Sequence, residues 1–290
     1  MATITDVPTT RPTAGQPSTA AVVRAEFFKA GRRLRTYVAY GFVIAIPIII
    51  TFVLKANPPD NFDEGPRLAF LGSLSGLLIP AFALRITSEF LLVVVVALFA
   101  GDAIAGEASW GNLRYLLMRP IARGRLFAAK FIVSVIYGWI AVAIVVLVGT
   151  VVGGIVFGFH GIELGFGPFG ISESASSIVG HLLIATVYVS WFLTTIIAFS
   201  FMLSCMTDSP GGAILGGVGL WITFAILDAI ESLGQIRYFF PTHWSGAWVD
   251  MFIRNSVSDD MIRGSLLTLG YVIVFVGIAA WWFHRKDIVS

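Results

Sequence analysis

Charged side chains cluster in the stretch GEASWGNLRYLLMRPIARGRLFAAK, at positions 106–130. The charged residues there are Glu107, Arg114, Arg119, Arg123, Arg125 and Lys130. Only 12% of the chain is charged, and the sequence on both sides of this stretch is strongly apolar. Arginines in such a place either bind anionic lipid headgroups and fix the topology, or form a handle for a cytoplasmic partner.

The residues that usually carry catalysis do not form a recognisable site. The sequence has no Gly-x-x-x-x-Gly-Lys-Ser/Thr, and even the dipeptide Gly-Lys is absent, so it contains no phosphate-binding P-loop. It also lacks Gly-x-Ser-x-Gly and His-Glu-x-x-His. A single cysteine, Cys205, excludes an internal disulfide and a multi-cysteine metal site. We therefore expect a protein that is not an enzyme and holds no cofactor of its own. The net charge of +2 gives no case for a nucleic-acid partner.

The composition predicts an all-α integral membrane protein. Hydrophobic residues make up 57% of the chain, and the mean hydropathy is +0.87. A helix needs about 20 mostly apolar residues to cross a bilayer. Six runs meet this requirement: 37–54, 87–105, 129–157, 181–203, 213–230 and 265–283.

The apolar segment 68–84, LAFLGSLSGLLIPAFAL, could be a seventh crossing. Counting it would place the arginine-rich stretch outside, against the positive-inside bias. With six crossings and a cytoplasmic N-terminus, most of the 19 basic residues face the cytoplasm, and so does the C-terminus. We therefore predict that 68–84 is an outer-leaflet helix or a re-entrant segment that leads into the second crossing.

The N-terminal region divides into two parts. Residues 1–20 are rich in Thr, Pro and Ala and are expected to be a disordered cytoplasmic tail. Residues 21–36 predict a basic amphipathic helix in the membrane interface, or alternatively a plain positive flank that orients the first crossing. Its apolar face would hold Val23, Phe27, Phe28 and Leu34, and its basic residues are Arg24, Lys29, Arg32, Arg33 and Arg35.

Residues 107–119 predict a short helix across the cytoplasmic mouth. Trp110, Leu113 and Leu117 recur at helical spacing on one stripe, and Arg114 lies on another face. Pro120 cannot continue the hydrogen-bond ladder, so a sharp corner should follow.

The same stretch resembles the first cytoplasmic loop of type-2 ATP-binding cassette (ABC) transporter permeases. The similar pattern is Glu107-x-x-x-Gly111-x-Leu113-Arg114-x-Leu116-Leu117-x-Arg119-Pro120-x-x-Arg123, followed by Lys130, with Asn112 where the family usually has Thr. Residues 21–36 resemble the family's connecting helix. The tail Trp281-Trp282-Phe283-His284-Arg285-Lys286-Asp287-Ile288 and the segment Pro241-Thr242-His243-Trp244 also resemble family features.

This resemblance implies a six-span permease domain over 37–290 in the cell membrane. It would be one subunit of an exporter, paired as a homodimer or heterodimer and served by two separate ATPase subunits that hold ATP and Mg²⁺. The implied coupling helix is about 106–120, with Glu107, Trp110, Gly111, Leu113, Arg114, Leu117, Arg119, Pro120 and Arg123 as coupling residues. The implied connecting helix would act through Arg24, Phe27, Phe28, Lys29, Arg32 and Arg33.

Several polar residues lie within or near the predicted crossings: Arg85, Glu89, Asp102, His181, Thr194 and Asp228. They could line a transport path, but because most lie near an interface a structural role is favoured. Arg85 and Glu89 could pair at i, i+4. Glycine pairs spaced by four, such as Gly149/Gly153, are expected to allow close helix packing within one subunit.

Two other functions remain open from the sequence. One is an ion-coupled carrier or channel that needs no ATPase, which mid-membrane acids and inverted repeats would favour. The other is a non-transporting membrane scaffold or sensor.

Overall fold

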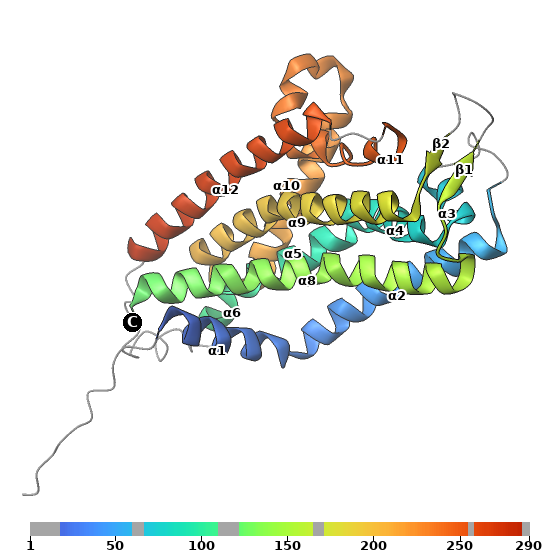
Figure 1. The fold of residues 1–290 in the computed structure, drawn as a ribbon. Helices are drawn as coiled ribbons and strands as arrows, with labels where there is room; N and C mark the ends of the chain where they lie inside the picture. Colours follow the sequence, from blue (N-terminus) through green and yellow to red (C-terminus); the bar gives the residue numbers. More distant parts are fainter. Residues whose placement is uncertain (1–17, 60–66, 110–121, 165–170, 255–257, 286–290) are drawn as a thin grey trace, which may run out of the picture.

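The computed structural model describes residues 18–59, 67–109, 122–164, 171–254 and 258–285, and it is a bundle of helices (Figure 1). Within these residues five helices are long and apolar enough to cross a membrane: α2 (Leu34–Ala56), α8 (Arg123–Phe157), α9 (Ala175–Met206), α10 (Pro210–Ala229) and α12 (Asp259–Arg285). A sixth candidate crossing consists of α4 (Ile79–Glu89) and α5 (Leu91–Asp102), which meet at a bend of 57°. The predicted helical membrane fold is therefore confirmed.

The second crossing differs from the sequence prediction. It begins at Ile79, where Pro80 suits the first helical turn, and not at residue 87. The segment 68–84 leads into this crossing as expected, but it divides into α3 (Arg67–Leu74), η1 (Gly76–Leu78) and the first residues of α4. Phe90, at φ −140° and ψ −57°, interrupts the helix between α4 and α5. Hydropathy could not locate this break because a mean over about 20 residues does not resolve the interruption of a single helical turn.

Shorter elements lie at the two ends of the bundle. The helices α1 (Thr19–Gly31) and α6 (Ala105–Ser109) lie at the same end as the C-terminus of α12 (Figure 1). The strands β1 (Ile162–Leu164) and β2 (Ile171–Glu173) form an antiparallel hairpin at the opposite end, beside α3. The all-α prediction missed this hairpin, because three residues are too few to show a strand pattern. The remaining elements are η3 (Glu231–Phe239), η4 (Pro241–Trp244) and α11 (Met251–Arg254).

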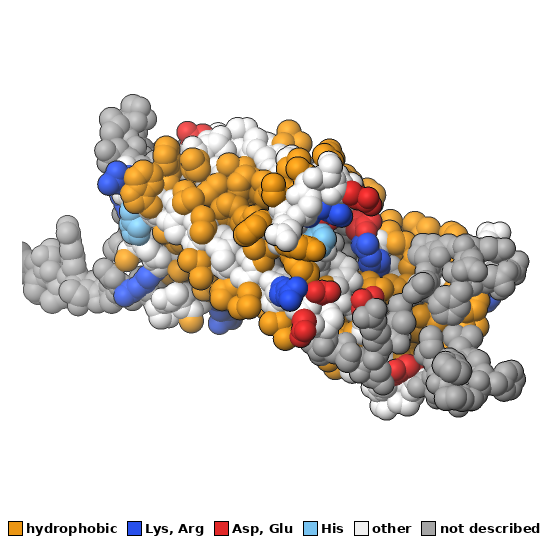
Figure 2. All heavy atoms as spheres, turned by 90° about the horizontal axis from the view of Figure 1, so that it is seen from above, with side chains coloured by type: hydrophobic (Ala, Val, Ile, Leu, Met, Phe, Trp, Pro, Cys, Tyr) orange, Lys and Arg blue, Asp and Glu red, His pale blue; other side chains and the backbone are white. Residues whose placement is uncertain are grey.

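The helix α9 is the centre of the bundle. Its buried residues occur on all faces, as expected for an apolar helix surrounded by other helices. Near one end, the Phe201 ring packs against Phe127 and Phe131 of α8, with ring centroids 5.2 and 5.3 Å apart. By contrast, α12 exposes Leu266, Ile273 and further apolar residues, and Figure 2 shows a broad apolar band on this side. Such a surface requires lipid or another protein as its neighbour.

The glycine pair Gly149/Gly153 of α8 permits close packing within the chain, as predicted. A Cβ on Gly153 would lie 2.6 Å from the carbonyl oxygen of Gly76 and 2.7 Å from Cβ of Ile79. A Cβ on Gly149 would lie 2.8 Å from Cα of Pro80. The start of α4 therefore rests directly on the backbone of α8, and only glycine leaves room for this contact.

We predict that Gly153→Ala destabilises the protein by about 1–3 kcal/mol, because the added methyl group forces η1 and α4 away from α8. Thermal unfolding in detergent measures the effect. Gly270→Ala on α12 is the matched control, since no described atom lies within 4 Å of the Cβ it would add. Equal melting temperatures for the two variants would contradict the close contact.

Candidate functional site: a buried ion-pair cluster

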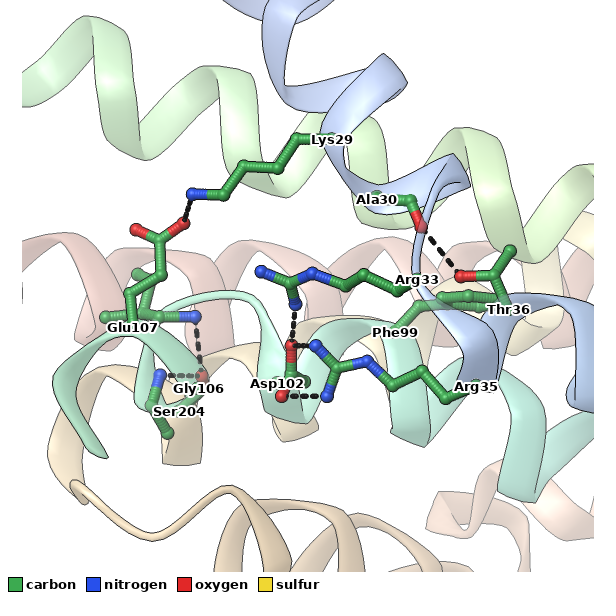
Figure 3. Close-up of polar contacts among 12 residues, drawn as sticks. Lys29, Ala30, Arg33, Arg35, Thr36, Phe99, Asp102, Gly106, Glu107 and Ser204 are labelled. Atoms are coloured by element: carbon green, nitrogen blue, oxygen red, sulfur yellow. Dashed lines mark hydrogen bonds and ion pairs between the residues drawn. The ribbon is translucent and has the colours of Figure 1, made fainter. Parts of the chain in front are cut away.

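Charged side chains from several segments meet at the end of the bundle that carries α1 and α6, and Figure 3 shows the part of this set that includes Lys29, Asp102 and Glu107. We call this set the ion-pair cluster: Glu26, Lys29, Arg33, Arg35, Asp102, Glu107 and Lys130. Its members come from α1, the α1–α2 turn and the start of α2, the end of α5, α6, and α8. Residues more than 100 positions apart are thus brought together.

Glu107 and Lys130 form the buried core of the cluster. The Nζ atom of Lys130 lies 2.8 Å from Oε1 of Glu107 and 2.9 Å from Oε2 of Glu26. The side chains of Glu107 and Lys130 are each only 3% exposed. Lys29 approaches the same Glu107 oxygen from α1 (Figure 3). Two acids and two ammonium groups therefore join α1, α6 and α8.

Asp102, the last residue of α5, forms the second half of the cluster. Arg35 donates to both of its carboxylate oxygens, and Arg33 donates to Oδ2 (Figure 3). The hydroxyl of Thr36 donates to the carbonyl oxygen of Ala30 at 2.7 Å, which holds the turn between α1 and α2. A bidentate arginine–carboxylate pair fixes direction as well as distance, so this half fastens the start of α2 to the end of α5.

The turn from α5 into α6 is held by a side chain of α9. The backbone N–H groups of Ile104 and Ala105 donate to the hydroxyl oxygen of Ser204, at 3.0 and 2.9 Å. Ser204 is fully buried. These bonds satisfy N–H groups at the start of α6 and place Glu107 in front of Lys130.

Burial sets the energetics of the cluster. A small cavity of about 40 Å³ lies among its side chains, which is room for a bound water or two. Burial by itself raises the pKa of Glu107, but the ammonium groups of Lys130 and Lys29 outweigh it and lower this pKa below its ordinary value. The cluster therefore holds Glu107 ionised.

The residues predicted for the connecting helix lie on different faces of α1. The side chain of Lys29 is in the cluster, and Arg33, in the turn that follows α1, also joins it. The backbone oxygen of Phe27 accepts a hydrogen bond from the Tyr137 hydroxyl of α8 at 2.8 Å. Arg24 and Arg32 are exposed, and Arg24 lies 5.8 Å from the centre of the Phe28 ring.

The predicted apolar face of this helix needs correction. Phe28 and Leu34 are exposed, whereas the other two predicted residues contact α8: Val23 packs there beside Val22, and the Phe27 ring lies 4.9 Å from the ring of Tyr137. In addition, residues 34–36 already belong to α2. Val22 and Glu26 are four residues apart and therefore lie on the same face of α1, so both side chains contact α8.

Most of the predicted coupling residues lie outside the described residues. These are Trp110, Gly111, Leu113, Arg114, Leu117, Arg119 and Pro120. Of the others, Glu107 is buried in the cluster, and Arg123 is exposed at the first position of α8.

The remaining polar candidates are dispersed. Arg85 and Glu89 form the i, i+4 pair that the sequence suggested. Thr194 accepts a hydrogen bond from Trp139 Nε1 at 3.2 Å and donates to its own helix, which is a packing role. His181 packs edge-on against a phenylalanine ring, with its buried Nδ1 unpartnered among the described residues.

Asp228 lies at the end of the bundle opposite the ion-pair cluster. Its Oδ1 atom is 2.8 Å from Nδ1 of His243 and 3.4 Å from Nε of Arg237. In the described part of the chain, no group of three or more His, Cys, Asp or Glu side chains is arranged to hold a metal ion.

Sequence reasoning did not identify Glu26 and Arg35 as partners in the site, and it treated Lys130 only as an anchor. The Arg35–Asp102 and Glu26–Lys130 pairs join residues 67 and 104 positions apart, so no local pattern reveals them. The available signal was the position of Asp102 and Lys130, both placed where apolar crossings begin or end. Charges at such positions require partners.

The fold defines a helical membrane protein with five or six candidate crossings. The chain belongs to the family described as "Protein of unknown function (DUF2705)", whose model matches residues 37–289.

Three relatives extend this comparison. The chain is 24% identical over 206 residues to the uncharacterized protein YhcI of Bacillus subtilis (strain 168), covering 67% of this chain and 63% of YhcI. It is 28% identical over 160 residues to the probable ABC transporter permease protein NosY of Stutzerimonas stutzeri, covering 54% and 52%. It is 29% identical over 170 residues to the protein of the same name in Pseudomonas aeruginosa, covering 55% and 54%. The chain thus spans less than two thirds of the length of each relative.

We predict that Lys130→Met destabilises the protein by about 3–5 kcal/mol, because it removes a buried partner of Glu107 and Glu26. Chemical unfolding in detergent measures this loss. The double variant Lys130→Met/Glu107→Gln should recover part of the lost stability, because it also removes the charge of Glu107 that the single variant leaves without its Lys130 partner. No recovery in the double variant would contradict direct pairing.

A pH dependence follows from the lowered pKa of Glu107. The stabilisation due to its ionised form is present above the unfolded pKa of about 4.3 and is lost as the pH falls through the lower folded pKa. We therefore expect the stability difference between the wild type and Glu107→Gln to be constant near pH 7 and to shrink below about pH 4.3. Unfolding measured across this range checks it, and a difference that grows at acid pH would contradict the assignment.

Proposed function

We propose that this chain is the membrane-spanning subunit of an ATP-driven ABC transporter of the type-2 permease class. Two relatives that carry the name of a probable ABC transporter permease support the proposal. The helical membrane fold is compatible with it. Because the sequence has no P-loop, the ATP and Mg²⁺ would be bound by separate ATPase subunits. We further propose a dimer of permeases with two ATPase subunits, working as an exporter in the cell membrane.

The observation that carries the proposal is the ion-pair cluster. It links α1, the proposed connecting helix, to α6, which overlaps the start of the proposed coupling helix, about 106–120. Through Lys130 and Asp102 it also links both helices to α8 and α5. A force applied to α6 would therefore reach two crossings and α1 through buried contacts that have little freedom to yield.

The orientation belongs to the same proposal. The end with α1 and α6 would face the cytoplasm, where the positive-inside bias places most basic residues. The N- and C-termini would then both be cytoplasmic. The ATPase would dock on the arginine-rich stretch, and nucleotide-driven closure would move α6 against α8.

We predict that the chain copurifies with an ATPase encoded by a neighbouring gene, and that Glu107→Gln weakens the link between hydrolysis and transport. The variant loses the charge that Lys29 and Lys130 bind, so α6 can move without moving α1 and α8. The measurement is ATPase activity of the reconstituted complex, which should lose its dependence on the permease. Asp259→Asn, at the exposed start of α12, is the control and should behave as wild type.

An ATPase that fails to copurify would contradict the proposal. So would a Glu107→Gln complex whose hydrolysis and transport remain coupled as in the wild type.

A further inference from the structure

An ion pair lies at the break in the second crossing. Arg85 and Glu89 are in the last turns of α4, directly before Phe90, where the helix bends by 57°. The Arg85 guanidinium donates to Oε1 of Glu89. The Glu89 side chain is 57% exposed and that of Arg85 is 34% exposed, so the pair lies on the surface of the helix bundle.

The helix lengths place this pair well inside the crossing. The 12 residues of α5 separate the break from Asp102 by about 18 Å at 1.5 Å per residue. The 11 residues of α4 extend about 16 Å on the other side. Because α4 is inclined at 57° to α5, it adds only about 9 Å along the direction of α5, so in a hydrocarbon core of about 30 Å Glu89 would lie about 9 Å from one membrane surface and about 18 Å from the other.

The break is held in place by neighbouring segments. Trp221 Nε1 of α10 donates to the carbonyl oxygen of Glu89 at 2.7 Å, which satisfies an acceptor at the end of α4. On the other side Arg85 lies against the backbone at Gly246, where an added Cβ would be 3.8 Å from Nη2. The exposed pair is therefore a fixed feature of the surface.

An exposed charge pair at this depth is incompatible with lipid as its neighbour. Charged side chains within membranes face a water-filled cavity or the interior of a bundle, because lipid cannot solvate them. Non-helical backbone at membrane depth follows the same rule, and broken crossings in transporters often mark a binding site. Both features coincide at Glu89.

From this we infer that the α4–α5 break borders a water-filled transport path, where Glu89 receives the cationic head group of an amphipathic substrate. This deepens the proposed function and rests on it. Glu89 is the more exposed member of the pair, and the exposed ring of Phe90 beside it also favours a cation. The exposed side chains of Ile86 and Ile222 nearby offer apolar contacts for the rest of such a molecule.

Reactivity of a single thiol tests the path. In the full chain with Cys205→Ser, reconstituted with its ATPase in lipid nanodiscs, Ile86→Cys places a thiol one turn from Glu89. The cationic, water-soluble reagent 2-(trimethylammonium)ethyl methanethiosulfonate should modify it. The matched control is Ile273→Cys, a 62% exposed position on α12 that lies 12 residues from the helix end at Arg285. It should remain unmodified. Glu89→Cys is the second reporter if Ile86→Cys does not fold.

The role of Glu89 is tested by charge selectivity. At Ile86→Cys, the cationic reagent should react faster than the anionic reagent 2-sulfonatoethyl methanethiosulfonate. Glu89→Gln in the same background should lower this ratio at least about threefold, as expected for a unit charge roughly 6 Å away in water. An unchanged ratio would overturn the cationic specificity.

The outcomes separate this inference from the proposed function. If the ATPase binds and the thiols at 86 and 89 stay inert, or react no faster than the thiol at 273, the path inference alone is overturned. If no ATPase binds and the thiol at 86 still reacts with the selectivity that depends on Glu89, the path stands and the ABC assignment fails.

Discussion

The ion pair between Glu107 and Lys130 is the interaction on which one end of this molecule depends. Both groups are withdrawn from water, and a buried charge of this kind is stable only when an oppositely charged partner is present. Glu26 and Lys29 add to the pair from α1, and the α1 helix is thereby held against the bundle. The α1 helix is thus held by these ion pairs together with apolar contacts, since Val22 and Val23 pack against Leu126 and Ala129 of α8.

The membrane environment accounts for most of the remaining architecture. Without water to bind, backbone groups must pair within each segment, and this requirement produces long helices. Helices in lipid associate by close packing of small residues, and Gly153 of α8 has no side chain, so the backbone of Gly76 can approach it directly. The second crossing is the exception, because its ladder is broken at Phe90 and an indole of α10 supplies one of the missing partners.

The two charged regions suit different tasks. The ion-pair cluster has a buried core and joins several helices, which suits the proposed transmission of force. The Arg85–Glu89 pair is exposed beside the break in the second candidate crossing, and we have proposed that it contacts the solute. The chain belongs to a family of unknown function, and two of its relatives are named as probable ABC transporter permeases. Both proposed tasks are compatible with a permease of that kind.

The sequence by itself located the long apolar helices, because hydropathy over about 20 residues is a local property, but it placed the start of the second candidate crossing at residue 87 and not at Ile79. It also predicted the i, i+4 pair of Arg85 and Glu89 and the packing use of Gly149 and Gly153. Only the tertiary structure decided that the second crossing is bent, and that Glu26, Arg35 and Lys130 complete one cluster with Asp102 and Glu107. Those pairs join distant positions, and their partners are chosen by how whole helices pack, a choice that local pattern cannot encode.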